Sequence, residues 1–186
     1  MGREFLTSDL HLGHANIIRY CNRPFSSEEE MTNTIIKRWN ERVKDEDIVH
    51  HVGDFCFKNS NESRGEGVRL KASHYDAQLK GKKIYYKGNH DRNNSMCTHL
   101  HATILDYGGS KYYITHRPED IDYNFPINFV GHVHQNWKFK RIARPLAFDV
   151  YMINVGVDVW DFYPKTIDEI LSKFQHWKKH LGGETS

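Results

Sequence analysis

Residues 82–91 read Lys-Lys-Ile-Tyr-Tyr-Lys-Gly-Asn-His-Asp (KKIYYKGNHD) and join a strand-like run to a polar turn. The β-prone residues at 82–86 predict a strand, and Gly88 marks the point where it ends. Asn89, His90 and Asp91 follow at once, and all three carry atoms that can bind a metal or exchange protons. The segment therefore predicts a strand that delivers a reactive turn to the edge of a sheet.

Four other strand-like runs also end in metal-competent side chains. They are residues 5–8 before Asp9 and His11, 48–52 before Asp54, 111–115 before His116, and 127–130 before His132 and His134. Loops beyond the carboxyl ends of neighbouring strands meet at one crevice, because the sheet holds those ends side by side. We therefore expect these side chains to converge.

Apolar residues at helical spacing predict helices over residues 27–43, 68–79 and 166–180, with a short helix beginning near Ala15. Further strands are expected at 102–105 and 151–155, and the polar stretch 58–67 is expected to be a loop. Strands alternate with helices early and cluster late, which favours an α/β fold of layered sheets covered by helices. The length suits one domain spanning residues 1–186.

The blocks DxH, GD, GNHD, a lone His and GHxH, in that order, resemble the calcineurin-like metallophosphoesterases. The resemblance covers about residues 5–134. It implies a four-layer α/β/β/α sandwich of two mixed β-sheets flanked by helices. The stretch 154–158 (NVGVD) adds a likeness to small bacterial and phage members of the family.

The resemblance also implies two divalent metal ions per chain. One would be held by Asp9, His11 and His134, the other by Asn89, His116 and His132, and Asp54 would bridge them. Imidazole and carboxylate together suit Mn, Fe, Zn or Ni better than Ca or Mg, which prefer oxygen-only ligands. Among these metals we favour manganese.

By resemblance the chain is a phosphoesterase in which a metal-bound hydroxide attacks a phosphate ester. GNHD resembles the phosphodiesterase-type members, and residues 53–58 (GDFCFK) depart from the GDxxDRG block of protein Ser/Thr phosphatases. We therefore expect the substrate to be a small or nucleotide-like phosphodiester. A phosphomonoesterase, a nuclease acting on DNA or RNA, and a catalytically inactive scaffold remain alternatives.

Residues beside the metal blocks are candidates for catalysis and substrate binding. The family resemblance makes His90 the general acid, and Asp91 could orient it. Arg92 and Arg117 could hold phosphate oxygens, since a guanidinium matches their geometry. His14 could reach the substrate or cap the helix that begins near Ala15.

Composition restricts partners only weakly. With 26 Lys+Arg against 24 Asp+Glu the net charge is +2, which predicts no broad basic face, although a basic stripe (Lys138, Lys140, Arg141, Arg144) could guide a nucleic acid strand. Three widely spaced cysteines suit a reducing compartment, and the lack of a leader or a long apolar run predicts a cytoplasmic protein without a membrane partner. Of the 13 histidines, five lie outside any metal block and are expected on the surface: His74, His99, His101, His176 and His180.

Overall fold

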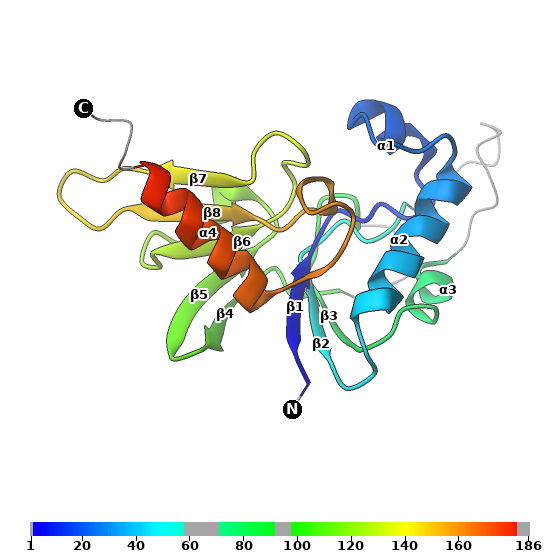
Figure 1. Ribbon diagram of the computed structural model, residues 1–186, viewed down its shortest axis with the longest axis horizontal. Coiled ribbons are helices and arrows are strands. Elements are labelled where there is room, and N and C mark those ends of the chain that lie inside the picture. The colour runs from blue at the N-terminus through cyan, green and yellow to red at the C-terminus, as the bar shows by residue number, and fades with distance from the viewer. Residues whose placement is uncertain (1, 58–70, 92–97, 182–186) are drawn as a thin grey trace.

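Two mixed β-sheets form the centre of the molecule in the computed structural model, which describes residues 2–57, 71–91 and 98–181 (Figure 1). The first sheet has the order β3-β2-β1-β9. Strands β1, β2 and β3 are parallel, and β9 runs antiparallel to β1. These strands are β1 (Glu4–Thr7), β2 (Ile48–His51), β3 (Lys82–Tyr85) and β9 (Lys165–Thr166).

The second sheet has the order β4-β5-β6-β8-β7. Its three central strands are parallel, and the edge strands β4 and β7 are antiparallel to their neighbours. The strands are β4 (Ala102–Tyr107), β5 (Ser110–Thr115), β6 (Ile127–Val130), β7 (Phe139–Ile142) and β8 (Val150–Asn154). The parallel strands of both sheets therefore end in the loops that carry the predicted ligands.

Helix α2 (Glu28–Arg42) covers the outer face of the first sheet, beside the short helices α1 (Ala15–Tyr20) and α3 (Ala72–Asp76) (Figure 1). Alternation along β1 explains this layering, because Phe5 packs in the core cluster that contains Trp39 of α2, whereas Leu6 packs in the cluster between the sheets. The helix begins where predicted, since the Ser27 side chain accepts a hydrogen bond from the Glu30 amide at its first turn.

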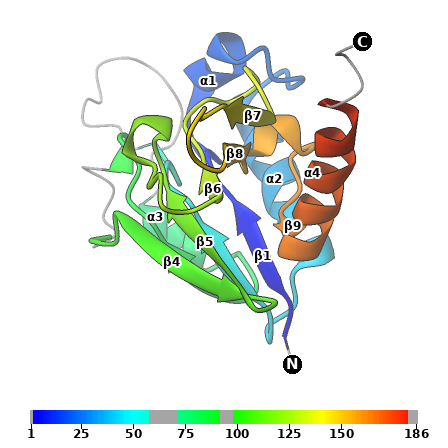
Figure 2. The ribbon, with the colours of Figure 1, turned by 90° about the vertical axis from the view of Figure 1, so that its left-hand side faces the viewer.

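Helix α4 (Ile167–Leu181) follows β9 directly and closes the other side of the molecule (Figure 2). Ile170 and Phe174 enter the cluster between the sheets, where the Phe174 ring contacts Tyr151 of β8 at 5.2 Å between centroids. A reciprocal pair of hydrogen bonds between Thr166 and Glu169 caps the first turn. Two mixed sheets flanked by helices confirm the predicted α/β fold class.

Some elements differ from the sequence expectations. Strands β7 and β9 were not predicted: β9 has only two residues, too few to show a period, and the middle residues of β7, Lys140 and Arg141, are exposed and charged. Helix α3 is shorter than the predicted 68–79, of which 68–70 fall outside the described residues together with the predicted loop 58–67. Among the described helices, none has the length and apolarity needed to cross a bilayer.

Candidate metal centre

The turns after the strands hold their side chains in a rare backbone conformation. Eight non-glycine residues of the described chain have positive φ, and five of them are predicted ligands: Asp9 (58°), His11 (50°), Asp54 (57°), His132 (71°) and His134 (47°). Left-handed backbone costs a side-chain-bearing residue about 1–3 kcal/mol, and such strain gathers at functional sites. Its concentration on these five residues therefore marks the strand ends as a site rather than as ordinary turns.

Two glycines let these turns approach one another. A Cβ atom on Gly88 would lie 2.0 Å from Asp54 Oδ1, and one on Gly53 would lie 2.4 Å from His116 Nδ1. Gly53 also has a φ of +87°, which suits glycine best. The sequence marked both as turn residues, and the structure adds that a side chain at either would displace a predicted ligand.

Asp9, His11 and His134 form the first half of the site. One ligand atom from each lies within 4.8 Å of the others. Asp9 and His11 are buried, and the Asp9 carboxylate accepts hydrogen bonds from the Ser8 hydroxyl and from the His132 amide, the latter at 3.0 Å. The predicted first ligand set is thus brought together.

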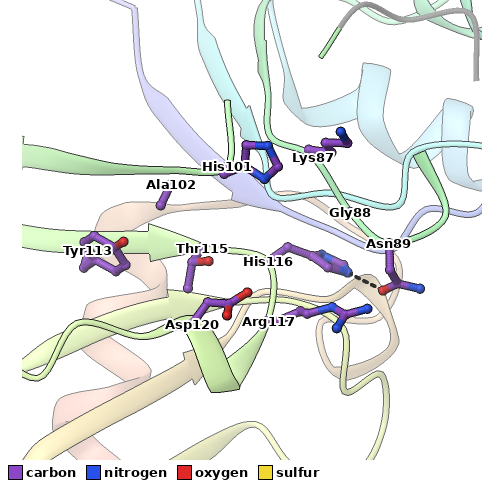
Figure 3. A pocket seen from close by; sticks show the side chains of 10 residues that line it. All are labelled: Lys87, Gly88, Asn89, His101, Ala102, Tyr113, Thr115, His116, Arg117 and Asp120. Carbon is purple, nitrogen blue, oxygen red and sulfur yellow. Dashed lines mark hydrogen bonds between the residues drawn. The ribbon is translucent and has the colours of Figure 1, made fainter. Parts of the chain in front are cut away.

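Asp54, His116 and His132 form a second group of the same size. Asn89 joins them, since its side-chain oxygen lies 3.1 Å from His116 Nε2 (Figure 3). Asp54 Oδ2 lies 3.4 Å from His116 Nε2 and 3.6 Å from His11 Nε2. The carboxylate therefore stands between the two halves, where a bridging ligand would be needed.

The donor atoms fit a pair of divalent cations. Asp54 Oδ2 and both ring nitrogens of His11 are buried without a hydrogen-bond partner among the described residues. Unsatisfied buried polar atoms are costly and rare in folded proteins, and a bound cation would supply the missing partner. Imidazole and carboxylate donors suit first-row transition metals. All seven predicted ligands lie together, and their metal-binding role remains a prediction.

In the metal-free chain, two of the predicted ligands, His116 and His134, are protonated at neutral pH. Burial opposes charge on His116, but its hydrogen bond to Asp54 and the charges of Asp9 and Asp54 raise its pKa to about 9. Asp158 likewise overcomes burial and raises the pKa of His134 to about 10. Burial lowers the pKa of His11 well below its usual value, so this ring is neutral at pH 7. Cation binding would therefore release protons from His116 and His134.

A buried ion pair between Arg23 and Asp158 supports the first half. The Asp158 carboxylate lies 2.9 Å from His134 Nδ1 and 2.8 Å from Arg23 Nε. Arg23 in turn donates to the backbone oxygens of Asp9, at 2.7 Å, and Leu10, at 3.0 Å. With Nδ1 engaged by Asp158, His134 can offer Nε2 to a cation.

No role was predicted for Arg23 or for Asp158. Asp158 appeared only within the NVGVD resemblance, and Arg23 lies in a segment without a strand-and-turn pattern. Cys21 has its sulfur within 4.8 Å of ligand atoms of His134 and Asp158, and no role was predicted for it either. The pattern that located the ligands gave no signal for the residues that support them.

His90 and His14 lie over the first half. The exposed His90 ring has its centroid 5.3 Å from that of His11, within reach of a group bound in front of the ligands. His14 stands at the N-cap of α1, yet its side chain makes no capping hydrogen bond there. Its buried ring stacks on Phe57 at 4.1 Å and lies 5.6 Å from His11, so it lies beside the first half, and its contact with a substrate remains a prediction.

Asp91 contacts the backbone of the ligand turns. Its carboxylate accepts hydrogen bonds from the amides of Asp54 (2.7 Å), Gly88 (2.8 Å) and Phe55 (3.1 Å). These contacts tie the turn of Asp54 to the turn of Asn89, which is a positioning role. Its predicted action on His90 remains a prediction.

Of the two arginines predicted to bind phosphate, only one lies among the described residues. Arg92 falls outside the described residues. Arg117 lines a pocket of about 670 Å³ that also borders Asn89 and His116 (Figure 3). In the predicted basic stripe, Lys138 lies over the Trp160 ring and Arg141 pairs with Asp149 at 2.8 Å, so both already have partners in the folded chain.

Known proteins resemble this chain along nearly its whole length. No family model matches it. The uncharacterised protein MJ1445 of Methanocaldococcus jannaschii is 35% identical over 188 residues, covering 96% of this chain and 94% of the relative. The gene 66 protein of Mycobacterium phage D29 is 26% identical and covers 91% and 94%. AQ665 of Aquifex aeolicus, a protein of unknown function, superposes with a TM-score of 0.66 at 20% identity, over 92% and 99%.

Proposed function

We propose that the chain, which belongs to the same family as MJ1445, is a calcineurin-like metallophosphoesterase and, more specifically, a dinuclear metal-dependent phosphodiesterase for small or nucleotide-like esters. The observation that carries the proposal is the convergence of seven donor side chains around buried atoms of His11 and Asp54 that lack protein partners among the described residues. When bound, such cations would polarise a phosphate ester and lower the pKa of a coordinated water towards about 7.

His90 supplies a proton donor. Its ring lies beside the first half of the centre, and its backbone amide donates to Asp54 Oδ1 at 2.9 Å, which fixes its position relative to the bridge. A donor held there protonates the leaving oxygen as the ester bond breaks. Arg117, at the mouth of the second half, orients a non-bridging oxygen.

A phosphodiester suits this site better than a monoester. The pocket of about 670 Å³ begins at Asn89 and His116 and gives room for a second ester group. A monoester would leave that space without a function. Manganese is the metal we propose first, because the donor set mixes imidazole nitrogen with carboxylate oxygen.

The test is a hydrolysis assay on metal-free protein reconstituted with Mn²⁺ or Zn²⁺. Bis-p-nitrophenyl phosphate and p-nitrophenyl phosphate report diester and monoester hydrolysis, and bound metal is counted by mass spectrometry. We expect about two ions per chain and faster diester hydrolysis. Protein that binds metal and cleaves neither compound, nor any nucleotide, would instead be the scaffold considered above.

A further inference from the structure

The pocket beside the second half of the centre lies between the two sheets at their open edge (Figure 3). Lys87 and Asn89 come from the turn after β3, and Tyr113 and Thr115 come from β5. His101 immediately precedes β4. The backbone amide of Lys87 donates to the carbonyl of Leu100 at 2.8 Å, which holds His101 beside Lys87. The pocket is therefore built from parts of both sheets and is continuous with the ligands.

Its polar lining is mainly basic. Lys87, His101 and Arg117 face it, against the single carboxylate of Asp120. Within the described residues neither Lys87 nor Arg117 forms an ion pair, whereas Lys83, on the same strand segment, is held by Asp76 at 3.2 Å. A half-buried lysine left without an anionic partner beside a cation centre is suited to binding an anion of the ligand.

The spacing along the chain fixes how far this anion would be from the reacting phosphate. Lys87 precedes the predicted ligand Asn89 by two residues, so their Cα atoms are at most about 7 Å apart. The lysine side chain adds several ångströms of reach into the pocket. This separation is comparable to that between successive phosphates of a nucleic acid strand, with one nucleoside between them.

We propose that the part of the pocket around Lys87 and His101 binds a second phosphate of the substrate, one nucleoside away from the phosphate at the metal centre, which Arg117 contacts. The preferred substrates are then short oligonucleotides that carry this additional phosphate, such as 5′-phosphorylated dinucleotides. Tyr113 provides a ring on which the base can stack. The inference rests on the proposed phosphodiesterase activity and names the substrate class of that site.

Binding can be measured without turnover. The probes are thymidine 3′,5′-bisphosphate, thymidine 5′-monophosphate and thymidine 3′-monophosphate, each titrated by calorimetry into the Mn²⁺-loaded chain. We expect the bisphosphate to bind about tenfold or more tightly than either monophosphate, the effect of one added charged hydrogen bond. Lys87→Ala should abolish most of that difference. The Kd of the tighter-binding monophosphate should stay within about twofold of its value in the unaltered chain. Lys82→Ala, which removes an exposed lysine at the start of β3 outside the pocket, is the matched control.

A parallel activity assay separates the two proposals. The kcat/KM for a 5′-phosphorylated thymidine dinucleotide should exceed that for the unphosphorylated dinucleotide, and Lys87→Ala should equalise them. Equal affinities for bisphosphate and monophosphates in the unaltered chain would overturn the second-phosphate site, even if bis-p-nitrophenyl phosphate is cleaved. An equal loss of affinity for the bisphosphate and for the monophosphates in Lys87→Ala would also overturn it. Failure to cleave any diester would contradict the proposed function whatever the binding result.

Discussion

The two halves of the candidate centre differ in how the protein supports them. His134 in the first half is held through its second ring nitrogen by Asp158, which is itself paired with the buried Arg23. His116 in the second half is oriented by a backbone group instead, the carbonyl of Val52 at 2.8 Å, and faces an open pocket. Under the proposed function, the first half would hold its cation through this support, and the second half would admit the substrate.

The largest effect is expected from the residue that joins the halves. Asp54→Asn keeps the shape of the side chain but removes the charge between His11 and His116, so neither cation retains its bridging ligand. Hydrolysis of bis-p-nitrophenyl phosphate should fall by at least about a thousandfold, the upper range for one electrostatic contact. Bound metal should drop in the same protein.

The control for that variant is Asp106→Asn, which makes the same chemical change at an exposed position of β4. It should match the unaltered chain in both measurements. Retention of two ions and of full activity by Asp54→Asn would mean that the halves are not bridged.

A mutation at His90 should separate chemistry from metal binding. His90 lies over the first half but is not needed as a ligand, so His90→Asn should lower kcat by about 10²- to 10⁴-fold with metal content unchanged. The loss should be smaller for a p-nitrophenyl leaving group, which needs little protonation, than for a nucleotide ester. An equal loss for both leaving groups would argue against the general-acid role.

The support of the first half can be tested through Asp158. Asp158→Asn removes the carboxylate that holds His134 Nδ1, and removal of such a contact costs about 10- to 100-fold in metal affinity. The loss should affect one of the two ions, measured as the weaker step of a Zn²⁺ titration against a chelating dye. Asp149→Asn, which breaks the exposed pair with Arg141, is the control. An equal loss of affinity for both ions would mean that the two halves do not differ in their support.

The pH dependence of stability offers a second comparison. His116 and His134 have folded-state pKa values of about 9 and about 10, above the ordinary 6.5, so the stability they contribute is complete below pH 6.5 and is lost as pH rises through 9 to 10. The metal-free chain should therefore melt at least about 3 °C lower at pH 10 than at pH 7. The metal-loaded chain should not, because cations replace those protons. Groups outside the centre titrate in both forms. An equal fall in melting temperature for the metal-free and the metal-loaded chain would therefore contradict this account.

The ligands could be predicted from the sequence because each follows the end of a strand. Parallel strands bring their carboxyl ends together, so local patterns at Asp9, Asp54 and His116 were enough to predict a shared site. The helical spacing of apolar residues gave the bounds of α2 within one residue at each end, and the order of helices and strands gave the fold class.

The residues that hold the predicted ligands in place and those that line the pocket could not be predicted in this way. The Arg23–Asp158 pair joins residues 135 positions apart, and no periodic pattern records which distant segments fold against each other. His101 was expected to be an ordinary surface residue because it lies outside any metal block, and it is exposed. Its place beside Lys87 could not be predicted, because it depends on how the turn after β3 meets β4. The backbone strain at five ligands is likewise visible only in the folded chain.

The smallest effect is expected at Arg117, in the open half. Its exposed side chain lines the pocket and forms no ion pair within the described residues, so Arg117→Ala should fold normally and retain both ions. An exposed charged contact to phosphate is weaker than a buried one, and we expect KM for a dinucleotide to rise by about five- to tenfold with little change in kcat. Arg19→Ala, at an exposed arginine of α1 outside the pocket, should leave both constants unchanged. If Arg117→Ala instead lowered kcat and left KM unchanged, this arginine would act in the transition state, and the open half would take part in the chemistry as well as in substrate binding.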